Sequence, residues 1–252
     1  MAITFLSSLI LGIIEGLTEF APVSSTAHII LGSHLLSIET TTFFEAFSIA
    51  IQTGAILAAV IFFWKQLWRD WSLIAKVIVG FIPTAIAGLL LHSLVSKLFD
   101  STILIAWMLI VGGVVFLFLK PIDTTETSLS EISYKEAFLI GCAQILAIIP
   151  GVSRSGATLI GGTLLKIPRT HIVLFSFILG IPTILGASVV ELRSLPSISI
   201  SQWGLIFAGA ITAFIVALVT MKFIINFLTK KPLSWFGWYR IVIGILVLLF
   251  VA

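Results

Sequence analysis

The chain alternates long apolar runs with short polar interruptions. Six of these runs have about 17–20 residues each, the length that an α-helix needs to cross the hydrocarbon core of a membrane. Charged residues, proline or other polar residues bound each run. The pattern predicts an all-α polytopic membrane protein with about six full transmembrane spans. We expect these spans at residues 45–63, 73–92, 102–119, 171–190, 203–221 and 235–251.

Two further apolar segments, residues 3–36 and 133–166, are interrupted in the middle. The first break covers residues 19–26 and the second covers residues 150–156, and both contain proline and several hydroxyl residues. Proline removes a backbone donor and glycine loosens a helix. Each segment is therefore predicted to form two half-helices, a broken re-entrant pair, that meet at a polar loop inside the membrane.

The two interrupted segments resemble each other after a shift of 129 residues. The shift aligns Gly12 with Gly141, Glu15 with Gln144, Leu17 with Leu146, Val23 with Val152, Ser24 with Ser153 and Gly32 with Gly161. We expect a single membrane domain over residues 1–252 that arose by internal duplication. Repeat one is about 1–119, repeat two is about 133–251, and a cytoplasmic linker covers 120–132. Repeats with discontinuous helices commonly build a site near the membrane midplane.

Loop charges predict how the two repeats are oriented. If each broken segment re-enters on its own side, Lys97 and Arg193 fall on one side of the membrane. The other side then carries Lys65, Arg69, Lys76, Lys120, Lys135, Lys166, Arg169, Lys222, Lys230 and Lys231. Lysine and arginine accumulate in cytoplasmic loops, so the richer side is the cytoplasmic one. The first broken segment then enters from outside and the second from the cytoplasm, which makes the two repeats inverted.

Composition supports the membrane interpretation and removes several alternatives. Hydrophobic residues make up 59% of the chain and charged residues 10%, and the mean hydropathy is +1.22. A soluble domain normally carries about 25% charged residues. The net charge is +3, but the basic residues lie at the ends of apolar segments, so we expect no nucleic-acid partner. Cys142 is the only cysteine, which excludes an internal disulfide and a cysteine metal cluster. We expect no removable signal peptide, because the first apolar segment runs into acidic residues without a small-residue cleavage site.

Acidic residues in the first broken segment are candidates for chemistry, because ionisable side chains at membrane depth are costly and usually functional. Glu15 and Glu19 are four residues apart and so share one helix face. Two carboxylates this close in a low dielectric need a proton or a cation between them. Arg154, a divalent metal ion or both can supply that cation. For Glu15, a position near the outer interface without a functional role is the alternative.

The second break carries the most specific pattern, Pro150-Gly-Val-Ser-Arg-Ser-Gly-Ala-Thr158. Gly151 and Gly156 allow the backbone to approach a ligand closely. The half-helix that follows presents free N–H groups and the positive end of its dipole. The Arg154 guanidinium suits phosphate oxygens, and the hydroxyl donors are Ser153, Ser155 and Thr158. This combination predicts an anion site that suits phosphate best. Arg154 can also serve only to neutralise Glu19, and the two roles are compatible.

A hydroxyl-rich segment, Ser24-Ser25-Thr26-Ala27-His28, begins the facing half-helix. One of its hydroxyls is expected to be an ordinary helix N-cap. His28 can receive or deliver a proton near neutral pH. A hydroxyl near a base and a carboxylate is a recognisable nucleophile arrangement. These residues leave open whether Ser25, His28 or a water molecule attacks.

Other polar and aromatic residues have weaker claims. Gln52 lies in a predicted span after the first break, and it either lines the site or has no role there. His34, His92 and His171 lie near span ends and are expected to be interfacial. Most of the tryptophans also cluster at span ends, as in an aromatic belt, and we assign them no catalytic role. They are Trp64, Trp68, Trp71, Trp203, Trp235 and Trp238.

Both signatures resemble those of the bacterial undecaprenyl-diphosphate phosphatase family of the bacitracin-resistance type. The first is Glu15-Gly-Leu-Thr-Glu-Phe-Ala-Pro-Val-Ser-Ser-Thr-Ala-His28 and the second is Pro150–Thr158. Phe175-Ser-Phe-Ile-Leu-Gly-Ile-Pro182 resembles a third family segment, and the likeness covers nearly the whole chain. One departure is Ala27, where the family usually has glycine.

The resemblance implies an enzyme of the bacterial plasma (inner) membrane that removes the terminal phosphate of undecaprenyl diphosphate. This reaction recycles the carrier lipid of cell-wall synthesis. The resemblance also implies a site that opens to the outer, periplasmic side and help from a divalent cation. We expect this cation to be Mg²⁺ or Ca²⁺ and to be held by Glu15 and Glu19. The family's functional residues match Glu15, Glu19, Ser25, His28 and Arg154. Supporting contacts are expected from Ser24, Thr26, Ser153, Ser155 and Thr158.

The main alternative is a transporter, because inverted repeats with broken helices are a transporter architecture. Such a protein could flip a phosphorylated lipid or carry an anion. Ser25, His28 and Glu19 together favour an enzyme, and a combined phosphatase and flippase stays open. A third alternative makes the polar residues interhelical contacts without chemistry, which the second break makes implausible. The sequence does not fix the metal, the lipid chain length or the oligomeric state, and a homodimer stays open.

Overall fold

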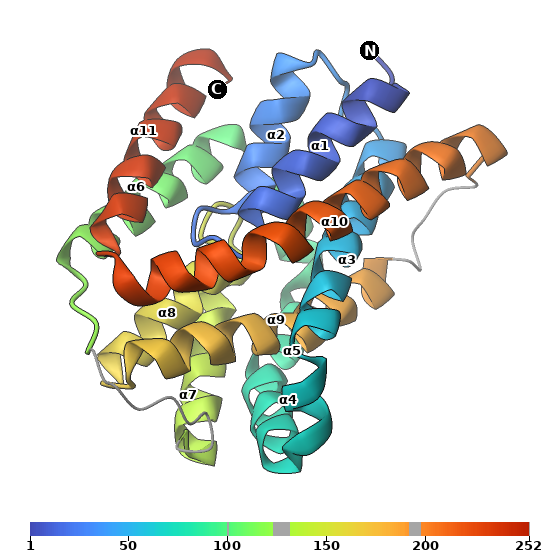
Figure 1. Cartoon of the computed structure of the whole chain (residues 1–252). Helices are drawn as coiled ribbons and strands as arrows, with labels where there is room; N and C mark the ends of the chain where they lie inside the picture. Colours follow the sequence, from blue (N-terminus) through green and yellow to red (C-terminus); the bar gives the residue numbers. More distant parts are fainter. Residues whose placement is uncertain (100, 123–131, 192–197, 252) are drawn as a thin grey trace.

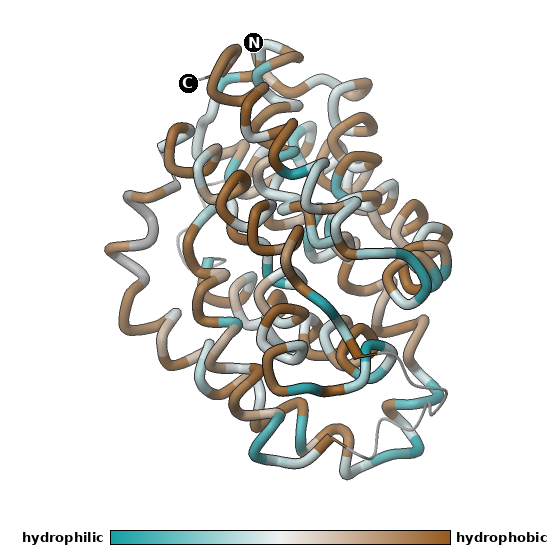
Figure 2. Tube along the Cα trace, turned by 90° about the vertical axis from the view of Figure 1, so that its left-hand side faces the viewer, coloured by the Kyte–Doolittle hydropathy of each residue, from teal (hydrophilic) through white to brown (hydrophobic). Residues whose placement is uncertain are grey.

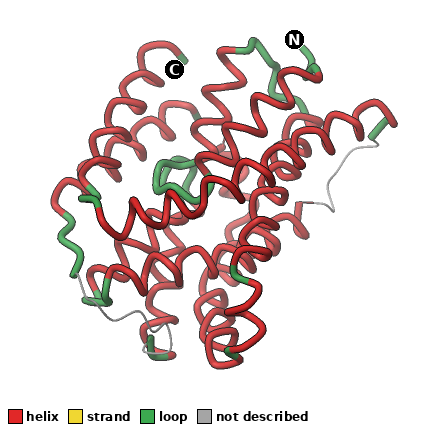
Figure 3. Tube along the Cα trace, in the orientation of Figure 1, coloured by secondary structure: helices red, strands yellow, loops and turns green. Residues whose placement is uncertain are grey.

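The computed structural model describes residues 1–99, 101–122, 132–191 and 198–251, and these ranges are almost entirely helical (Figure 3). Long helices cross one another at varied angles and enclose two short loops near the centre (Figure 1). In chain order the helices are α1 (Phe5–Thr18), α2 (Ser25–Leu35), α3 (Thr42–Phe62), α4 (Trp64–Arg69), α5 (Trp71–Phe99), α6 (Thr102–Phe118), α7 (Tyr134–Gln144), the short 3₁₀ helix η2 (Ile145–Ile148), α8 (Arg154–Leu164), α9 (Arg169–Glu191), α10 (Ile200–Lys230) and α11 (Ser234–Phe250).

The structure is that of a polytopic membrane protein. Within the described residues, α3, α5, α9 and α10 are long and apolar enough to cross a membrane. The other two predicted spans, α6 and α11, are apolar helices of 17 residues each, so the count of six spans stays a prediction. Brown, hydrophobic tube dominates the helices, and teal gathers mainly at loops and helix ends (Figure 2).

Every predicted span is a helix, but α5 and α10 are much longer than predicted. We expected 73–92 and 203–221, whereas α5 runs from Trp71 to Phe99 and α10 from Ile200 to Lys230. Hydropathy reports only the part of a helix inside the hydrocarbon core, while backbone hydrogen bonding continues the helix beyond it. The six-residue helix α4 was not predicted, because it is too short to give a periodic signal.

Both predicted breaks are present, and they lie side by side. Helix α1 ends at Thr18 and α2 begins at Ser25, while α8 begins at Arg154 after the loop that follows η2. The two green loops meet at the centre of Figure 3. The Ser155 hydroxyl of the second break donates to the Ala21 carbonyl of the first at 3.1 Å. The fold therefore joins the two polar segments into one site.

Glycine contacts seat the first half-helix of each broken pair. Helix α1 packs on α10 at Gly12, where a Cβ atom would lie 2.5 Å from the carbonyl oxygen of Gly209. Helix α7 packs on α5 in the same way, with Gly141 against the carbonyl oxygen of Gly80. These contacts bring backbone against backbone, so the half-helices penetrate deep enough for the breaks to meet.

Some expectations concern residues whose structure is not described, and one is corrected. Arg193 and residues 123–131 of the expected linker lie outside the described residues, as do the side chains of His92 and Lys97. The six belt tryptophans are all more than 40% exposed, which fits their expected place at the membrane surface. His171 was expected at an interface but is fully buried, because α9 turns that side of its first turns into the protein.

Candidate active site

Glu19 and Arg154 form a buried ion pair that joins the two breaks. Arg154 Nη2 donates to Glu19 Oε1 at 3.0 Å, and the two side chains are only 11% and 7% exposed. Arg154 Nη1 donates to the Ser176 carbonyl of α9 at 2.8 Å, so the guanidinium is held from two directions. The sequence analysis offered both a phosphate-binding and a charge-neutralising role for Arg154. The geometry provides the neutralising contact directly.

Ser25 lies on the other oxygen of the same carboxylate. Its hydroxyl donates to Glu19 Oε2 at 2.7 Å in a buried position. Glu19 therefore carries Arg154 on one oxygen and Ser25 on the other. A carboxylate that accepts the proton of a hydroxyl is the arrangement that general-base activation requires.

His28 does not lie where a base for Ser25 must lie. Its Nδ1 donates to the Ser24 carbonyl at 2.8 Å, and its Nε2 is 2.7 Å from the Tyr239 hydroxyl. The two rings are also stacked, with centroids 5.6 Å apart. In the neutral ring, Nε2 then accepts the Tyr239 proton. The contact was not predictable, because Tyr239 is 211 residues away in sequence.

Glu15 is fully buried beside Glu19 rather than exposed at an interface. Its exposed fraction is 0%, and its carboxyl interacts electrostatically with that of Glu19. Neither of its oxygens has a hydrogen-bond partner among the described residues. Acceptors in such a position call for a proton or a cation. No group of three acidic, histidine or cysteine side chains in the described ranges can hold a metal ion alone. A cation between the two carboxylates would need further oxygens from the substrate, which is how Mg²⁺ is commonly bound.

The hydroxyls of the second break divide into two groups. Ser153 lines the cavity described below and caps α8, accepting from the Gly156 amide at 3.2 Å. Ser155 and Thr158 instead point into the protein, and the Thr158 hydroxyl lies 2.6 Å from that of Ser176. These two hydroxyls therefore tie α8 to its neighbours, and the supporting contacts with a ligand that were expected of them stay a prediction.

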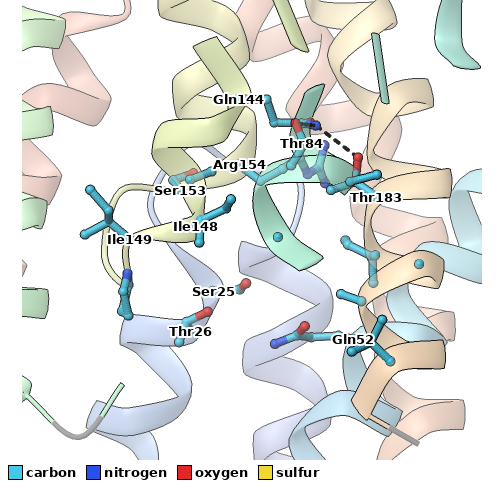
Figure 4. Close-up of a pocket in the computed structure, with 18 of the residues that line it drawn as sticks. Ser25, Thr26, Gln52, Thr84, Gln144, Ile148, Ile149, Ser153, Arg154 and Thr183 are labelled. Carbon is cyan, nitrogen blue, oxygen red and sulfur yellow. Dashed lines mark hydrogen bonds between the residues drawn. The ribbon is translucent and has the colours of Figure 1, made fainter. Parts of the chain in front are cut away.

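A cavity of about 530 Å³ opens beside this ion pair. Polar side chains from both breaks and from α3, α5, α7 and α9 point into it (Figure 4). Further along α5 and α9 the lining is mainly apolar, up to Glu191 at the end of α9. The predicted residues that line it are Glu19, Ser24, Ser25, Thr26, Gln52, Gly151, Ser153 and Arg154, whereas Glu15, His28, Ser155, Gly156 and Thr158 do not. The cavity therefore has a charged end beside the ion pair and a mainly apolar part along α5 and α9.

Three lining residues that the sequence analysis missed form a polar cluster. Gln144 Nε2 donates to the Thr84 hydroxyl at 2.9 Å and to the Thr183 hydroxyl at 3.1 Å, and Figure 4 shows the contact with Thr183. The alignment of Gln144 with Glu15 was the one available signal. Thr84 and Thr183 each follow a proline inside a helix, which is a weak signal that could have marked them.

Arg240 is a further residue that the sequence analysis left without a role. It is 1% exposed and donates to the carbonyls of Pro22 at 3.0 Å and of Gly151 at 2.9 Å. It also donates to the carbonyls of Met108 and Leu109 on α6. No acidic side chain pairs with it in the described ranges. One guanidinium therefore fixes both breaks to α6 and α11.

Comparison with known proteins places this geometry in a family. The family described as "Bacitracin resistance protein BacA" matches residues 8–246. The chain belongs to the BacA family. Proteins named undecaprenyl-diphosphatase are similar over nearly their whole length. The one from Aquifex aeolicus is 41% identical over 243 residues (94% of this chain, 95% of the relative), and the one from Persephonella marina is 43% identical over 251 residues (98% of each).

A relative from Campylobacter jejuni subsp. jejuni serotype O:2, also named undecaprenyl-diphosphatase, is 44% identical over 245 residues. That match covers 95% of this chain and 91% of the relative. The BacA family match includes both breaks, the third segment and Arg240. Membership in the BacA family agrees with the resemblance inferred from the signatures, and it makes the chain an integral membrane protein of a bacterial phosphatase family.

Proposed function

We propose that the protein hydrolyses undecaprenyl diphosphate to undecaprenyl phosphate and inorganic phosphate. The observation that carries this proposal is the chain of contacts from Ser25 through Glu19 to Arg154 at the polar end of the cavity. Hydrolysis of a diphosphate requires a positive charge near the phosphate oxygens and a nucleophile, and binding of a long isoprenoid chain requires apolar walls. The cavity offers all three, and the names of the relatives favour the same reaction.

In the proposed mechanism the terminal phosphoryl group enters beside Arg154. The guanidinium and the N-terminus of α8 stabilise the charge on its oxygens. Nη1 and Nη2 of Arg154 each carry two N–H groups, and each makes one of the contacts described above, so the guanidinium keeps further donors for phosphate oxygens.

The bond changes follow from the contact between Ser25 and Glu19. As Ser25 Oγ forms a bond to the terminal phosphorus, Glu19 takes the hydroxyl proton. The bond from that phosphorus to the bridging oxygen breaks, and undecaprenyl phosphate leaves with the electron pair. Water then hydrolyses the phosphoserine to inorganic phosphate and restores Ser25. Of the three nucleophiles left open by the sequence, the geometry favours Ser25, because His28 is engaged by Ser24 and Tyr239.

We also propose a divalent cation, Mg²⁺ or Ca²⁺, as cofactor. Glu15 and Glu19 would hold it together with oxygens of the diphosphate. Bound there, it would neutralise charge on the transferring phosphoryl group. The support is the buried, unpartnered carboxylate of Glu15, which a cation would satisfy.

The proposed architecture is an inverted duplication, and paired backbone features support it. Four non-glycine residues in the described ranges have positive φ, and they form two pairs 129 residues apart. These pairs are Ser24 (68°) with Ser153 (74°) and Ser37 (53°) with Lys166 (61°). The glycine contacts Gly12–Gly209 and Gly141–Gly80 exchange under the same shift. With the cytoplasmic side assigned by loop charge, the cavity opens to the periplasm. Whether the protein forms a homodimer is left to experiment.

Transport, the alternative function, has no support in the comparisons, since the relatives described above are named as phosphatases. The contact between a hydroxyl and a carboxylate also serves chemistry rather than passage of a ligand.

The decisive experiment measures phosphate release from undecaprenyl diphosphate by the purified protein, with and without Mg²⁺ or Ca²⁺. A Glu19→Gln variant should lose at least a hundredfold in rate, because the amide cannot take the Ser25 proton. Glu45→Gln is the matched control, since Glu45 is exposed at the start of α3. No release by the folded parent with either metal would overturn the proposal.

A further inference from the structure

The two breaks are built differently at equivalent residues. Ser24 and Ser153, which the shift of 129 residues aligns, each precede a half-helix and have positive φ values of 68° and 74°. This backbone conformation is uncommon for residues other than glycine and persists only where the surroundings hold it. The Ser153 hydroxyl caps its own half-helix by accepting from the Gly156 amide, whereas the Ser24 hydroxyl makes no such cap. The Ser24 backbone therefore needs another support.

His28 provides this support at the Ser24 carbonyl. That oxygen accepts from the His28 amide at 3.3 Å and from His28 Nδ1 at 2.8 Å. In the second break the Ser153 carbonyl accepts from the Ala157 amide at 2.9 Å, and alanine has no ring nitrogen to add a second bond. The His28 ring thus takes the place of the missing cap, and Ser24 lies on the cavity wall with its hydroxyl outside any cap.

Tyr239 determines which nitrogen of His28 carries the proton. Its hydroxyl lies 2.7 Å from Nε2, and its ring stacks on the imidazole with the centroids 5.6 Å apart. A neutral imidazole has one N–H donor and one acceptor, and the partner of one nitrogen fixes the role of the other. Because the Ser24 carbonyl can only accept, Nδ1 carries the proton and Nε2 accepts from Tyr239. Loss of the Tyr239 hydroxyl would remove the partner that selects this tautomer.

This arrangement bears on catalysis because Ser25 comes next in the chain. The Ser25 hydroxyl donates to Glu19 Oε2 at 2.7 Å, and a change of the Ser24 backbone would move it away from that oxygen. A displacement of about 1 Å at a reacting atom can lower a rate about a hundredfold. We propose that Tyr239 is a positioning residue for the phosphatase reaction and acts through His28. The pair holds the Ser24 backbone and thereby keeps Ser25 at Glu19, a role that rests on the proposed function.

Tyr239→Phe tests the proposal, because it removes the hydroxyl and keeps the stacked ring. The matched control is Tyr134→Phe, since Tyr134 is the other tyrosine of the chain and is exposed at the start of α7. Phosphate release from undecaprenyl diphosphate is measured against lipid concentration in detergent, beside the melting temperature of each protein. Tyr239→Phe should lower kcat about tenfold or more and leave KM within about twofold, because the walls of the cavity are unchanged. The control should match the parent.

A second variant separates positioning from proton transfer. His28→Asn places an amide N–H near the position of Nδ1 and has no titratable nitrogen. It should keep a rate within about tenfold of the parent, because it can still donate to the Ser24 carbonyl. Adding Tyr239→Phe to His28→Asn should cost nothing further, since an amide needs no partner to fix its proton.

An unchanged kcat in Tyr239→Phe, or an equal loss in Tyr134→Phe, would overturn the proposal, and this comparison stands by itself if His28→Asn does not fold. Loss of all phosphate release by a folded His28→Asn protein would also overturn it, in favour of proton transfer by the imidazole. No release by the folded parent with either metal would instead overturn the proposed function, and the positioning role with it.

Discussion

At the scale of single residues, Glu19 organises the candidate site. Its two oxygens have different partners: Oε1 accepts from the Arg154 guanidinium and Oε2 accepts from the Ser25 hydroxyl. This division pairs the carboxylate with Arg154 and leaves its second oxygen in position to take a proton from Ser25. The residue types were predictable from the sequence. Their pairing was predictable only as one of two roles for Arg154, because the partners are 135 residues apart.

Gly180 tests the placement of Arg154 without removing any charge. A Cβ atom at Gly180 would lie 2.5 Å from Arg154 Cζ. Because the clash is with the far end of a flexible side chain, Gly180→Ala should still fold, with a lower melting temperature from the weakened ion pair. It should displace the guanidinium from Glu19 and lower kcat on the order of tenfold to hundredfold.

Gly204→Ala is the control for that measurement, since nothing lies within 4 Å of the added atom. Full activity of a folded Gly180→Ala protein would show that the position of Arg154 against α9 is unimportant for turnover.

Glu15 tests the proposed cation. Glu15→Gln should fold, because Gln144 is accommodated at the aligned position. It should raise the Mg²⁺ or Ca²⁺ concentration needed for half-maximal phosphate release about tenfold or more, since one of two carboxylate ligands is lost. The measurement is phosphate release against metal concentration, with Glu45→Gln beside it. An unchanged metal requirement would remove Glu15 from the cation site.

At the scale of elements, the breaks are where the sequence and the structure agree best. Proline, glycine and clustered hydroxyls are local signals, so the ends of α1, α2 and α8 followed from nearby residues. Contacts between distant elements left no such signal. Tyr239 contacts His28, and Arg240 contacts both breaks. Both residues lie on α11, whose sequence indicates only another apolar span.

Arg240 should matter for stability more than any exposed cation. Arg240→Met leaves the carbonyls of Pro22 and Gly151 without their donor, and each bond from a charged group contributes about 1.5–3 kcal/mol. The free energy of unfolding should fall by about 3 kcal/mol or more, seen as a lower melting temperature in detergent. Lys222→Met, an exposed change on α10, is the control and should have little effect. A melting temperature equal to that of the parent would contradict the role of Arg240 as a tie between the breaks.

At the scale of the whole molecule, the all-helical membrane fold was predictable because hydropathy reports the solvent that each helix meets. The ends of α5 and α10 were not, since a helix continues past the membrane boundary without an apolar run. The cavity was predictable in kind from the two breaks. The part of the cavity lined by Thr84 and Thr183 was not predictable, because it depends on packing between α5 and α9, which carry no recognised motif at these positions.

Orientation can be tested with single cysteines in a Cys142→Ala background. Thr40 and Lys135 are both exposed, and loop charge places Thr40 outside and Lys135 in the cytoplasm. A membrane-impermeant thiol reagent added to intact cells should label Thr40→Cys and spare Lys135→Cys. After the cells are opened, both should react. The reverse labelling pattern in intact cells would show the opposite membrane orientation, with the mouth of the cavity on the cytoplasmic side.

The ties made by Arg240 impose an order on synthesis. A ribosome finishes both breaks long before it reaches α11, the last helix that the structure describes. Until Arg240 has been synthesised, the carbonyls of Pro22 and Gly151 lack their hydrogen-bond donor. Insertion of α11 is therefore the step that completes the site. A growing chain in the membrane should stay inert toward lipid until its synthesis is almost finished.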